Sequence, residues 1–455
     1  GTAIFKSEHL ITSLFASQNK GNFADTFDNT LLDIAKKNSD IFSVITAGGE
    51  KVSLFENLSR YVSDNRDDFC KAIINKLVGF SFENIFDEGF DFFASIFEYL
   101  IKDYNIDSGG KYAEYFTPHS VSGIIAKCLV SDNEKGINNV SCYDPSAGSG
   151  TLLMSLAHQI GEDKCTIYTQ DISQKSSNLL RLNLILNKLV HSLHNVIQGN
   201  TILRPAHKDR NGKLTTFDYV VANPPFKLDF SDFRDELTKR ENSERFFAGI
   251  PNIPPKKKES MAIYLVFLQH IIFSLKPNGK AAVVVPTGFI TAQTGIDLKI
   301  RKKIVDEKML RGVVSMPSNI FATTGTNVSI LFIDKTNKED VVLIDASALG
   351  EKVKEGKNQK ILLSVDDETQ IIDIFNSKKV IDDLSIVVNY EDIKSKNYSI
   401  SAGQYFDVKI ENVEISATEF SDKMDNYSKR LKDLNVKSRE LESNIKKQLM
   451  RLKYD

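Results

Sequence analysis

The stretch of this sequence best equipped for chemistry is Asn223-Pro224-Pro225-Phe226, which follows a hydrophobic run over residues 217–222. Asn223 offers a side-chain carbonyl oxygen, and the Pro224 carbonyl is held stiffly by the ring geometry of proline. Two acceptors aimed at one point suit an exocyclic amino group, because they take both hydrogens and turn the nitrogen lone pair outward. Phe226 adds a flat face for a planar ring. The stretch predicts a site for an aryl amine; a rigid turn that caps a strand is the alternative.

A glycine-rich loop lies upstream, in the run YDPSAGSGTLL over residues 143–153. Asp144 ends a predicted strand, and Gly148 and Gly150 allow a tight turn into a helix, at the carboxyl end where open α/β sheets bind ligands. The loop has neither the GxGxxG spacing of dinucleotide folds nor the Lys-Ser/Thr pair of a P-loop. An acid at its head favours a cationic or amine-bearing cofactor; an ordinary turn between strand and helix is the alternative.

Two further polar residues end predicted strands and could face the same crevice. Asp171 follows Gly150 by 21 residues, a position from which an acid can accept hydrogen bonds from both hydroxyls of a ribose. Asn200, in the run QGNTI, ends the next strand-like unit, and its amide could reach the same ligand. A surface turn is the alternative for Asp171.

Alternating strands and helices are predicted to position these residues. Between about residues 111 and 345, strand-like runs such as CTIYTQDIS alternate with helical runs such as TLLMSLAHQIG. This alternation is typical of an α/β protein with a mostly parallel sheet. The run of strands near the end of the region predicts antiparallel additions at one edge of the sheet.

Segments of a different character flank this region. Residues 1–110 are predicted to form an N-terminal helical domain, since apolar residues recur at helical spacing and Gly109-Gly110 marks a boundary. Residues 411–455 carry apolar residues in a 3–4 repeat, with charges between them and no Gly or Pro. This pattern predicts a coiled-coil-type helix that binds another helix, within the chain or in a second subunit. Packing of the helix on its own protein body is the alternative.

Composition narrows the class of protein. The chain has 58 Lys and Arg against 60 Asp and Glu, so it carries no global positive charge for nucleic acid. Its four cysteines show no CxxC spacing, which favours reduced thiols in the cytoplasm. His191 and His194 have no evident third ligand, so no metal site is predicted. The longest apolar stretch, residues 264–275, is too short to span a membrane.

Together the motifs resemble those of the S-adenosylmethionine-dependent amino-methyltransferases of DNA. DPSAGSG, QDI and NPPF occur in the order of that family's motifs I, II and IV, and KYAEYFTPHSV over residues 111–121 resembles motif X in the γ arrangement. LRGVVSMPSNIFATTGTNVSILFI and NYSISAGQYF are similar to the modification (M) subunit of Type I restriction–modification systems. The resemblance spans roughly residues 90–410 and implies a Rossmann-like methyltransferase domain over residues 111–410.

The resemblance implies roles at matching positions. Residues 115–118 would wrap the methionine end of S-adenosylmethionine, with the Thr117 hydroxyl near its carboxylate; Asp144 would face that end, and Asp171 would hold the ribose. Phe226 would stack on a flipped adenine, and Phe321 could cover its other face. The implied catalytic residues are Asn223, Pro224, Pro225 and Phe226. The implied cofactor-binding residues are Glu114, Tyr115, Phe116, Thr117, Pro118, His119, Asp144, Ser146, Ala147, Gly148, Ser149, Gly150, Thr151, Asp171, Ile172 and Asn200.

The sequence departs from the family pattern at three points. Glu114 stands where the family usually has Gln. Asn200 stands where an acid often contacts the adenine of the cofactor, and an amide oxygen can still accept that bond. The N-terminal domain is shorter than the family's, as expected of a truncated or divergent member. The basic run IPPKKKES over residues 253–260 could contact DNA phosphate or form a solvated loop.

These features predict an N6-adenine DNA methyltransferase, the catalytic subunit of a Type I restriction–modification complex. An N4-cytosine DNA methyltransferase is the alternative of the same chemistry, and a non-catalytic DNA-binding or assembly subunit is the alternative of a different class. The expected partners are double-stranded DNA and a separate specificity (S) subunit that grips residues 411–455. A second copy of the chain and a restriction (R) subunit could join the assembly.

Overall fold

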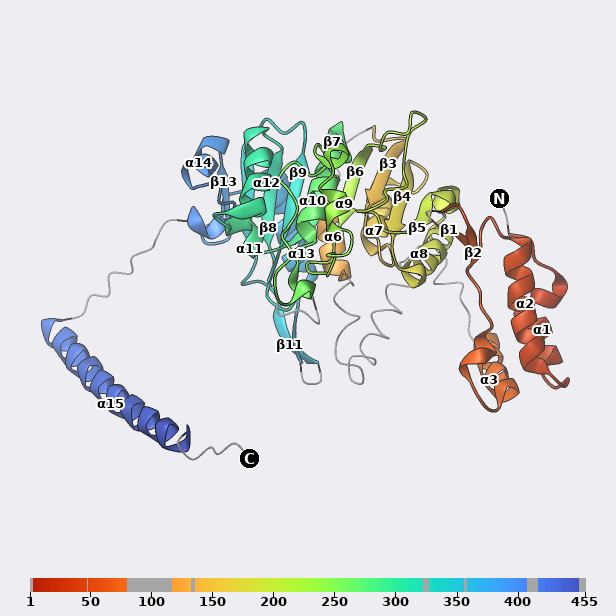
Figure 1. The fold of residues 1–455 in the computed structure, drawn as a ribbon, viewed down its shortest axis with the longest axis horizontal. Coiled ribbons are helices and arrows are strands. Elements are labelled where there is room, and N and C mark those ends of the chain that lie inside the picture. The colour runs from red at the N-terminus through yellow and green to blue at the C-terminus, as the bar shows by residue number, and fades with distance from the viewer. Residues whose placement is uncertain are drawn as a thin grey trace. The chain divides into compact units, whose positions relative to one another are not determined.

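A computed structural model gives the fold of this chain (Figure 1). It describes residues 3–46, 48–79, 117–131, 136–321, 327–355, 358–406 and 416–449. The chain divides into two compact units, Gly1–Phe406 and Asp407–Asp455. The first unit contains a large sheet, and the second contains one long helix.

Within the described residues, eleven strands form one sheet in the order β13-β10-β8-β9-β7-β6-β3-β4-β5-β1-β2. Neighbours from β7 to β1 pair parallel, as do β8 and β10. The strands β2, β9 and β13 pair antiparallel with their neighbours. The strands of this sheet are β1 (Ser43–Thr46), β2 (Lys51–Ser53), β3 (Val140–Asp144), β4 (Cys165–Asp171), β5 (Val196–Gln198), β6 (Phe217–Ala222), β7 (Leu275–Pro286), β8 (Leu310–Ser315), β9 (Val328–Asp334), β10 (Val341–Asp345) and β13 (Ser385–Val388). The predicted α/β fold with a mostly parallel sheet is confirmed.

Helices cover both faces of the sheet, because its central strands are apolar on both sides. Along β6, Tyr219 and Val221 join one buried cluster, whereas Val220 and Ala222 join the other. The first cluster takes side chains from α6, α7, α8 and α13, and the second from α10, α11, α12 and α14. The α-helices are α1 (Ile11–Ser17), α2 (Phe23–Lys37), α3 (Arg66–Val78), α6 (His119–Leu129), α7 (Thr151–Ile160), α8 (Gln174–Leu186), α9 (Arg234–Leu237), α10 (Tyr264–Phe273), α11 (Gly288–Thr291), α12 (Gly295–Asp306), α13 (Val365–Ser377), α14 (Tyr390–Ser395) and α15 (Ala417–Leu449).

The N-terminal segment is helical in α1, α2 and α3, but it also extends the sheet. Its hairpin β1–β2 joins the edge strand β5 through parallel pairing with β1. The buried Arg181 guanidinium on α8 donates to the carbonyls of Asp40 and Ile41, just before β1. The sequence prediction of a helical domain therefore lacked this hairpin, whose short strands give little periodicity of their own.

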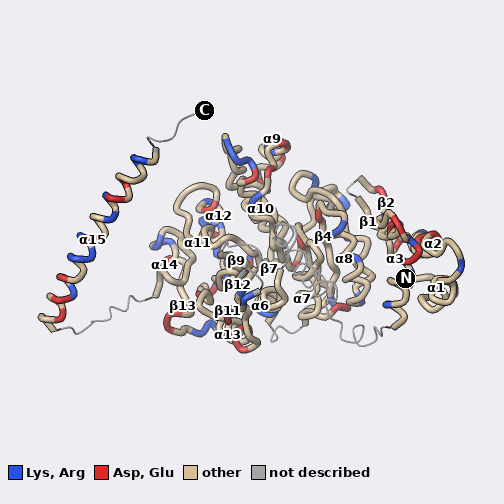
Figure 2. The backbone as a smooth tube through the Cα atoms, turned by 90° about the horizontal axis from the view of Figure 1, so that it is seen from below, with Lys and Arg blue, Asp and Glu red and all other residues tan. Residues whose placement is uncertain are grey.

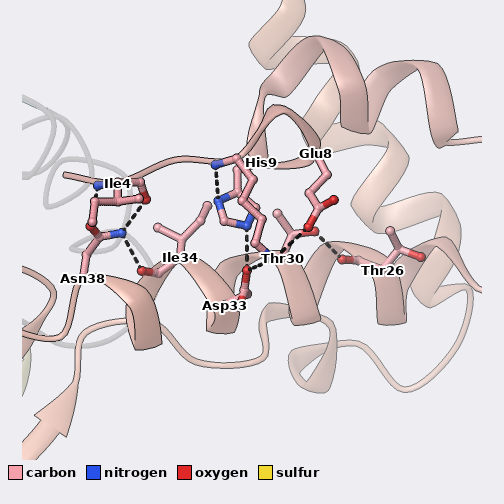
Figure 3. A network of polar contacts seen from close by, with 9 residues as sticks. Ile4, Glu8, His9, Thr26, Thr30, Asp33, Ile34 and Asn38 are labelled. Carbon is pink, nitrogen blue, oxygen red and sulfur yellow. Dashed lines mark hydrogen bonds and ion pairs between the residues drawn. The ribbon is translucent and has the colours of Figure 1, made fainter.

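A polar network fastens the first residues to α2 (Figure 3). His9 Nδ1 accepts from the Lys6 backbone N–H at 3.2 Å, and His9 Nε2 lies 2.8 Å from Asp33 Oδ2. The Lys6 ammonium lies 2.9 Å from Glu8 Oε1 and 3.0 Å from Asp33 Oδ2. The lysine thus supplies the positive charge between the two carboxylates, and we assign the cluster a structural role.

The second unit consists of α15 among the described residues. The helix begins with a capping box, in which Ser416 Oγ accepts from the Glu419 N–H and Glu419 Oε2 accepts from the Ser416 N–H. Its apolar side chains are exposed within this unit, with Tyr427 and Leu431 more than half exposed. In the part of the chain that the structure describes, no helix has the length and apolar character needed to cross a bilayer.

Candidate cofactor and target-base site

A cavity of ≈ 380 Å³ opens where β3, β4, β5 and β6 end. This volume lies within the range of small-molecule sites. The cavity is lined by Pro145, Ser146, Gly148, Ser149, Asp171, Ile172, Ser173, Ser176, Leu179, Asn200, Thr201, Ile202, Asn223, Pro225, Leu228, Phe233, Ile263 and Phe267. Eight of the predicted site residues therefore meet at one cavity, namely Ser146, Gly148, Ser149, Asp171, Ile172, Asn200, Asn223 and Pro225.

The glycine loop brings the ends of β3 and β4 together. Gly148 N–H donates to Asp171 Oδ2 at 3.0 Å, and Ser173 N–H donates to Asp171 Oδ1 at 2.7 Å. Burial raises the pKa of Asp171, while these two N–H donors act in the opposite direction. At Gly150, with φ +89°, an added Cβ would lie 2.1 Å from Leu180 Cδ1, so the turn requires glycine. The loop therefore fixes a carboxylate at the cavity wall.

Asp144 is a buried carboxylate beside a second, smaller cavity. Its side chain is only 1% exposed and accepts from the Ser146 N–H at 2.8 Å. Burial, helped by the nearby Asp171 carboxylate, raises the pKa of Asp144 to about 8. The small cavity measures ≈ 10 Å³ and is lined by Thr117, Asp144, Ser146, Ala147, Ser149, Thr151, Leu152 and Asn223. Such a carboxylate would be stabilised in its charged form by a cationic group.

Asn223, directly after β6, lines both cavities. Its Nδ2 donates to Thr117 Oγ1 at 3.1 Å, so the amide nitrogen is engaged and the amide oxygen remains as an acceptor. The prediction placed the Thr117 hydroxyl near a cofactor carboxylate; the structure shows it bonded to the Asn223 amide. Thr117 is buried, and Pro118 and His119, which follow it at the start of α6, line neither cavity.

The Phe226 ring packs against other aromatic side chains. Its ring lies edge to face with Tyr264 of α10, with centroids 6.3 Å apart. The Tyr264 hydroxyl donates to Asp297 Oδ1 at 2.6 Å, and the Tyr264 ring packs in turn on Phe289. The Phe226 ring is half-buried, and the preceding Pro224 is buried. This chain of contacts fixes the orientation of a ring that could stack on a planar base.

Asn200 and Phe321 differ from their predicted roles. Asn200 lines the larger cavity, but its Oδ1 already accepts from the Ile202 N–H at 3.1 Å and the Leu203 N–H at 3.0 Å. The predicted acceptor role is therefore taken by the local turn, and the amide NH₂ is the group left for a ligand. Phe321 is 5% exposed, belongs to the buried cluster that includes α6 and α7, and lines neither cavity. Glu114, Tyr115 and Phe116 lie outside the described residues.

Sequence reasoning missed a buried cation behind the cavity. Arg245 donates from Nη1 to the Ile202 carbonyl at 2.8 Å, from Nη2 to the Thr201 carbonyl at 3.1 Å and from Nε to His270 Nδ1 at 3.0 Å. His270 Nε2 lies 3.2 Å from the Tyr143 hydroxyl, next to Asp144. Burial lowers the pKa of Arg245 to about 10 and lowers that of His270 well below its usual value. A lone arginine in a charged loop gives no sequence signal of burial.

The apolar side of the cavity was also missed. Phe267 belongs to a third buried cluster, to which the segment after β6 and α10 contribute, and the partly buried Phe233 packs against it. Leu228, which also lines the cavity, is 40% exposed. These residues are 60 or more positions away from the glycine loop. The apolar run over residues 264–275 predicts a buried helix, but it does not predict the cavity that this helix borders.

Comparisons with known proteins agree with this geometry. The model of a family described as N-6 DNA Methylase matches residues 88–414. The chain is 28% identical to the Type I restriction enzyme MpnII methylase subunit of Mycoplasma pneumoniae over 84% of this chain and 69% of that protein. It is 25% identical to the Type I restriction enzyme HindI methylase subunit of Haemophilus influenzae over 93% of each protein.

A solved structure shares the fold. The type I restriction-modification system methyltransferase subunit from Streptococcus thermophilus superimposes with a TM-score of 0.69 at 22% identity, covering 89% of this chain and 81% of that one. At this identity the likeness concerns the fold alone. The family model, however, spans well over half of the sequence and includes the glycine loop and Asn223–Phe226. The chain belongs to the N-6 DNA methylase family.

Proposed function

We propose that this chain is the catalytic subunit of a Type I restriction–modification complex and transfers a methyl group from S-adenosylmethionine to N6 of an adenine in DNA. The observation that carries the proposal is Asn223, which borders a cavity of ≈ 380 Å³: its amide nitrogen donates to Thr117, and its oxygen accepts no hydrogen bond from any described residue. Membership of the N-6 DNA methylase family supports the reaction type.

The residues around the cavities fit S-adenosylmethionine. Asp144, which is buried with no cation beside it among the described residues, suits the cofactor's ammonium group, and Asp171 suits the ribose hydroxyls. The apolar residues Phe233, Ile263 and Phe267 suit the adenine ring. When bound, the cofactor supplies a methyl group that is activated by a positively charged sulfur.

The four residues Asn223–Phe226, directly after β6, would hold the target adenine. The base must first leave the DNA helix, which costs a few kcal/mol. Asn223 Oδ1 and the Pro224 carbonyl would then accept both N6 hydrogens, and Phe226, braced by Tyr264, would stack on the ring. The N6 lone pair would point at the methyl group, and its proton could leave after attack, so no strong base is required. Orientation is then the main contribution of the protein to the rate.

Assembly with other subunits belongs to the same proposal. The relatives from Mycoplasma pneumoniae and Haemophilus influenzae are named as subunits of Type I restriction enzymes. We assign residues 1–110 to an N-terminal domain, 111–410 to catalysis and 411–455 to assembly, with a specificity subunit bound through the exposed apolar side chains of α15. A second copy of the chain, a restriction subunit and double-stranded DNA complete the proposed complex, which would act in the cytoplasm.

Analysis of the methylated product tests the proposal. The chain, purified with its co-purifying subunits from the native host, is incubated with duplex DNA and methyl-labelled S-adenosylmethionine, and the DNA is digested to nucleosides. We expect the label in N6-methyladenine. Label in N4-methylcytosine would support the alternative base, and cofactor binding without any transfer would support a non-catalytic assembly subunit.

A further inference from the structure

A two-stranded ribbon stands apart from the main sheet. Strands β11 (Glu351–Glu355) and β12 (Asn358–Leu362) pair antiparallel with each other and form a sheet of their own. Figure 1 shows β11 projecting past the end of the main sheet. Val353 and Leu362, on one face of the ribbon, are 40% and 45% exposed, and Lys352 and Lys354, on the other face, are also exposed.

The ribbon lies at the same end of the sheet as Asn223, the end where the parallel strands have their carboxyl termini. Because β9 pairs antiparallel with both β7 and β8, strands β8 and β10 run in the direction of β6. The ribbon follows β10, and its Ile361 N–H donates to the Asn319 carbonyl, after β8, at 3.3 Å. Strands β10 and β6 are four places apart in the sheet, roughly 19 Å at about 4.8 Å per place. A nucleic acid bound at Asn223 would therefore pass close to the ribbon.

Among the described residues of the ribbon, one face carries two lysines and no carboxylate. Lys352 and Lys354 alternate with Val353, so both lie on one face of the ribbon. Their cross-strand partners on that face are Ile361 and Gln359. Both lysines are exposed, and neither ammonium group has a hydrogen bond or ion pair within the described residues. Strand alternation places Glu351 on the other face. Figure 2, turned toward this edge of the sheet, shows basic positions near β11 and β12.

These features fit duplex DNA. The major groove admits a two-stranded β-ribbon, and unpaired lysines bind phosphates with release of counterions. We propose that the ribbon β11–β12 binds the DNA backbone beside the target base through Lys352 and Lys354. This inference rests on the proposed function, because it locates a contact with the substrate of that reaction.

Salt-dependent DNA binding tests the ribbon. The ribbon variant is Lys352→Gln/Lys354→Gln. The control variant is Lys308→Gln/Lys338→Gln, which removes two exposed lysines just before β8 and β10, at the amino-terminal end of these strands and so at the other end of the sheet. Full-length protein with its co-purifying subunits is titrated with a short duplex over a range of salt concentrations. The ribbon variant is expected to bind on the order of 10-fold more weakly at ~0.1 M salt, with a salt slope shallower by about 2.

Three further measurements make the result specific. Lys352→Arg/Lys354→Arg should restore binding, the control variant should bind like the unchanged protein, and the cofactor dissociation constant should be equal in all of them. Equal DNA binding by the ribbon and control variants would overturn the inference. So would loss of a co-purifying protein from the ribbon variant at unchanged DNA affinity, since the ribbon would then bind protein. Absence of methyl transfer by the unchanged protein would instead contradict the proposed function. The comparison of DNA binding would still show whether the ribbon contacts DNA.

Discussion

At the scale of single residues, the bond between Asn223 and Thr117 has the most direct consequence for catalysis. The two residues are 106 positions apart, and the 3.1 Å bond joins the end of β6 to the segment before α6. Because Nδ2 donates to Thr117 Oγ1, the amide oxygen would be the atom that accepts from the target amino group in the proposed reaction. Thr117 is therefore a positioning residue in the proposed reaction.

Replacement of Thr117 by valine tests this positioning. Thr117→Val keeps the shape of the side chain but removes the acceptor, so the amide loses its fixed orientation. We expect the single-turnover methylation rate to fall about 5-fold, equivalent to about 1 kcal/mol, while the cofactor dissociation constant changes little. Thr117→Ser, which keeps the hydroxyl, is the matched control. An unchanged rate in Thr117→Val would show that the bond does not position the amide.

Asp144 should make cofactor binding depend on pH. Its raised pKa means that its contribution to the free energy of unfolding is fully present below the ordinary value of 3.8 and is lost as pH rises through about 8. An ammonium group requires the carboxylate, so cofactor affinity should strengthen from pH 6 to pH 8, by up to about tenfold per unit. Calorimetry over this range should show the trend in the unchanged protein and a weaker, flatter profile in Asp144→Asn. A flat profile in the unchanged protein would contradict the assignment.

At the scale of elements, the segment after β6 packs on α10 and holds the cavity wall through Arg245. The guanidinium satisfies the carbonyls of Thr201 and Ile202, which would otherwise be buried without partners. His270, a neutral acceptor of the Arg245 Nε–H, connects this wall to the strand that ends in Asp144. The cavity is thus built by elements that are far apart in sequence.

Loss of the Arg245 guanidinium should weaken both the fold and the cofactor site. Arg245→Met leaves two buried carbonyls without donors, and we expect a loss of about 2–3 kcal/mol in the free energy of unfolding, together with weaker cofactor binding. Denaturant unfolding and calorimetry measure the two effects. The exposed Arg240 in the same segment provides the control Arg240→Met, which should match the unchanged protein. Equal midpoints for the two variants would exclude the structural role of Arg245.

The sequence predicted the main elements well, because their signals are local. The helix at TLLMSLAHQIG and the strands that end at Asp144, Asp171 and Ala222 follow from periodicity and glycine positions. The family and the mostly parallel sheet are confirmed. The strand β9 is antiparallel as expected, although it lies inside the sheet and not at its edge, whereas the antiparallel edge strand β13 lies beyond the region in which strands were predicted. The assignment of individual site residues stays a prediction.

The parts that escaped prediction depend on contacts between distant segments. The hairpin β1–β2 reaches β5 across about 150 residues, and Arg245 is buried only because the Thr201 turn folds over it. The sequence predicted Asn200 as a ligand-binding residue, but its side-chain oxygen accepts hydrogen bonds from backbone N–H groups of the turn that follows it. Phe321 matches a family motif, yet it lies in a buried cluster whose members come from segments far apart in sequence. Local sequence patterns carry no information on these contacts between distant segments.

At the scale of the whole molecule, the chain carries its catalytic unit and α15 as separate bodies. The exposed apolar residues of α15 are Phe420, Met424, Tyr427, Leu431, Leu434, Val436, Leu441 and Ile445. An apolar stripe on a helix of 33 residues is costly in water and is typical of a helix that pairs with another. This supports the proposed docking of a specificity subunit.

Charge placed in the α15 stripe should release that subunit. Leu431→Glu/Leu434→Glu disrupts the apolar seam, whereas Lys429→Glu/Asp433→Lys changes the polar side and leaves the net charge unaltered. We expect the first variant to lose its co-purifying subunit and site-specific methylation while it keeps cofactor binding, and the second to keep all three. Retention of the subunit by the stripe variant would place the docking surface elsewhere.

The most direct test of the central claim is the methylation rate of Asn223→Ala at saturating cofactor. The account predicts that the unchanged protein labels N6 of adenine, and that Asn223→Ala binds S-adenosylmethionine within about twofold of the unchanged protein but reacts roughly 100-fold more slowly, as expected for the loss of a group that acts in the transition state. Methylation by Asn223→Ala at the unchanged rate would contradict the account.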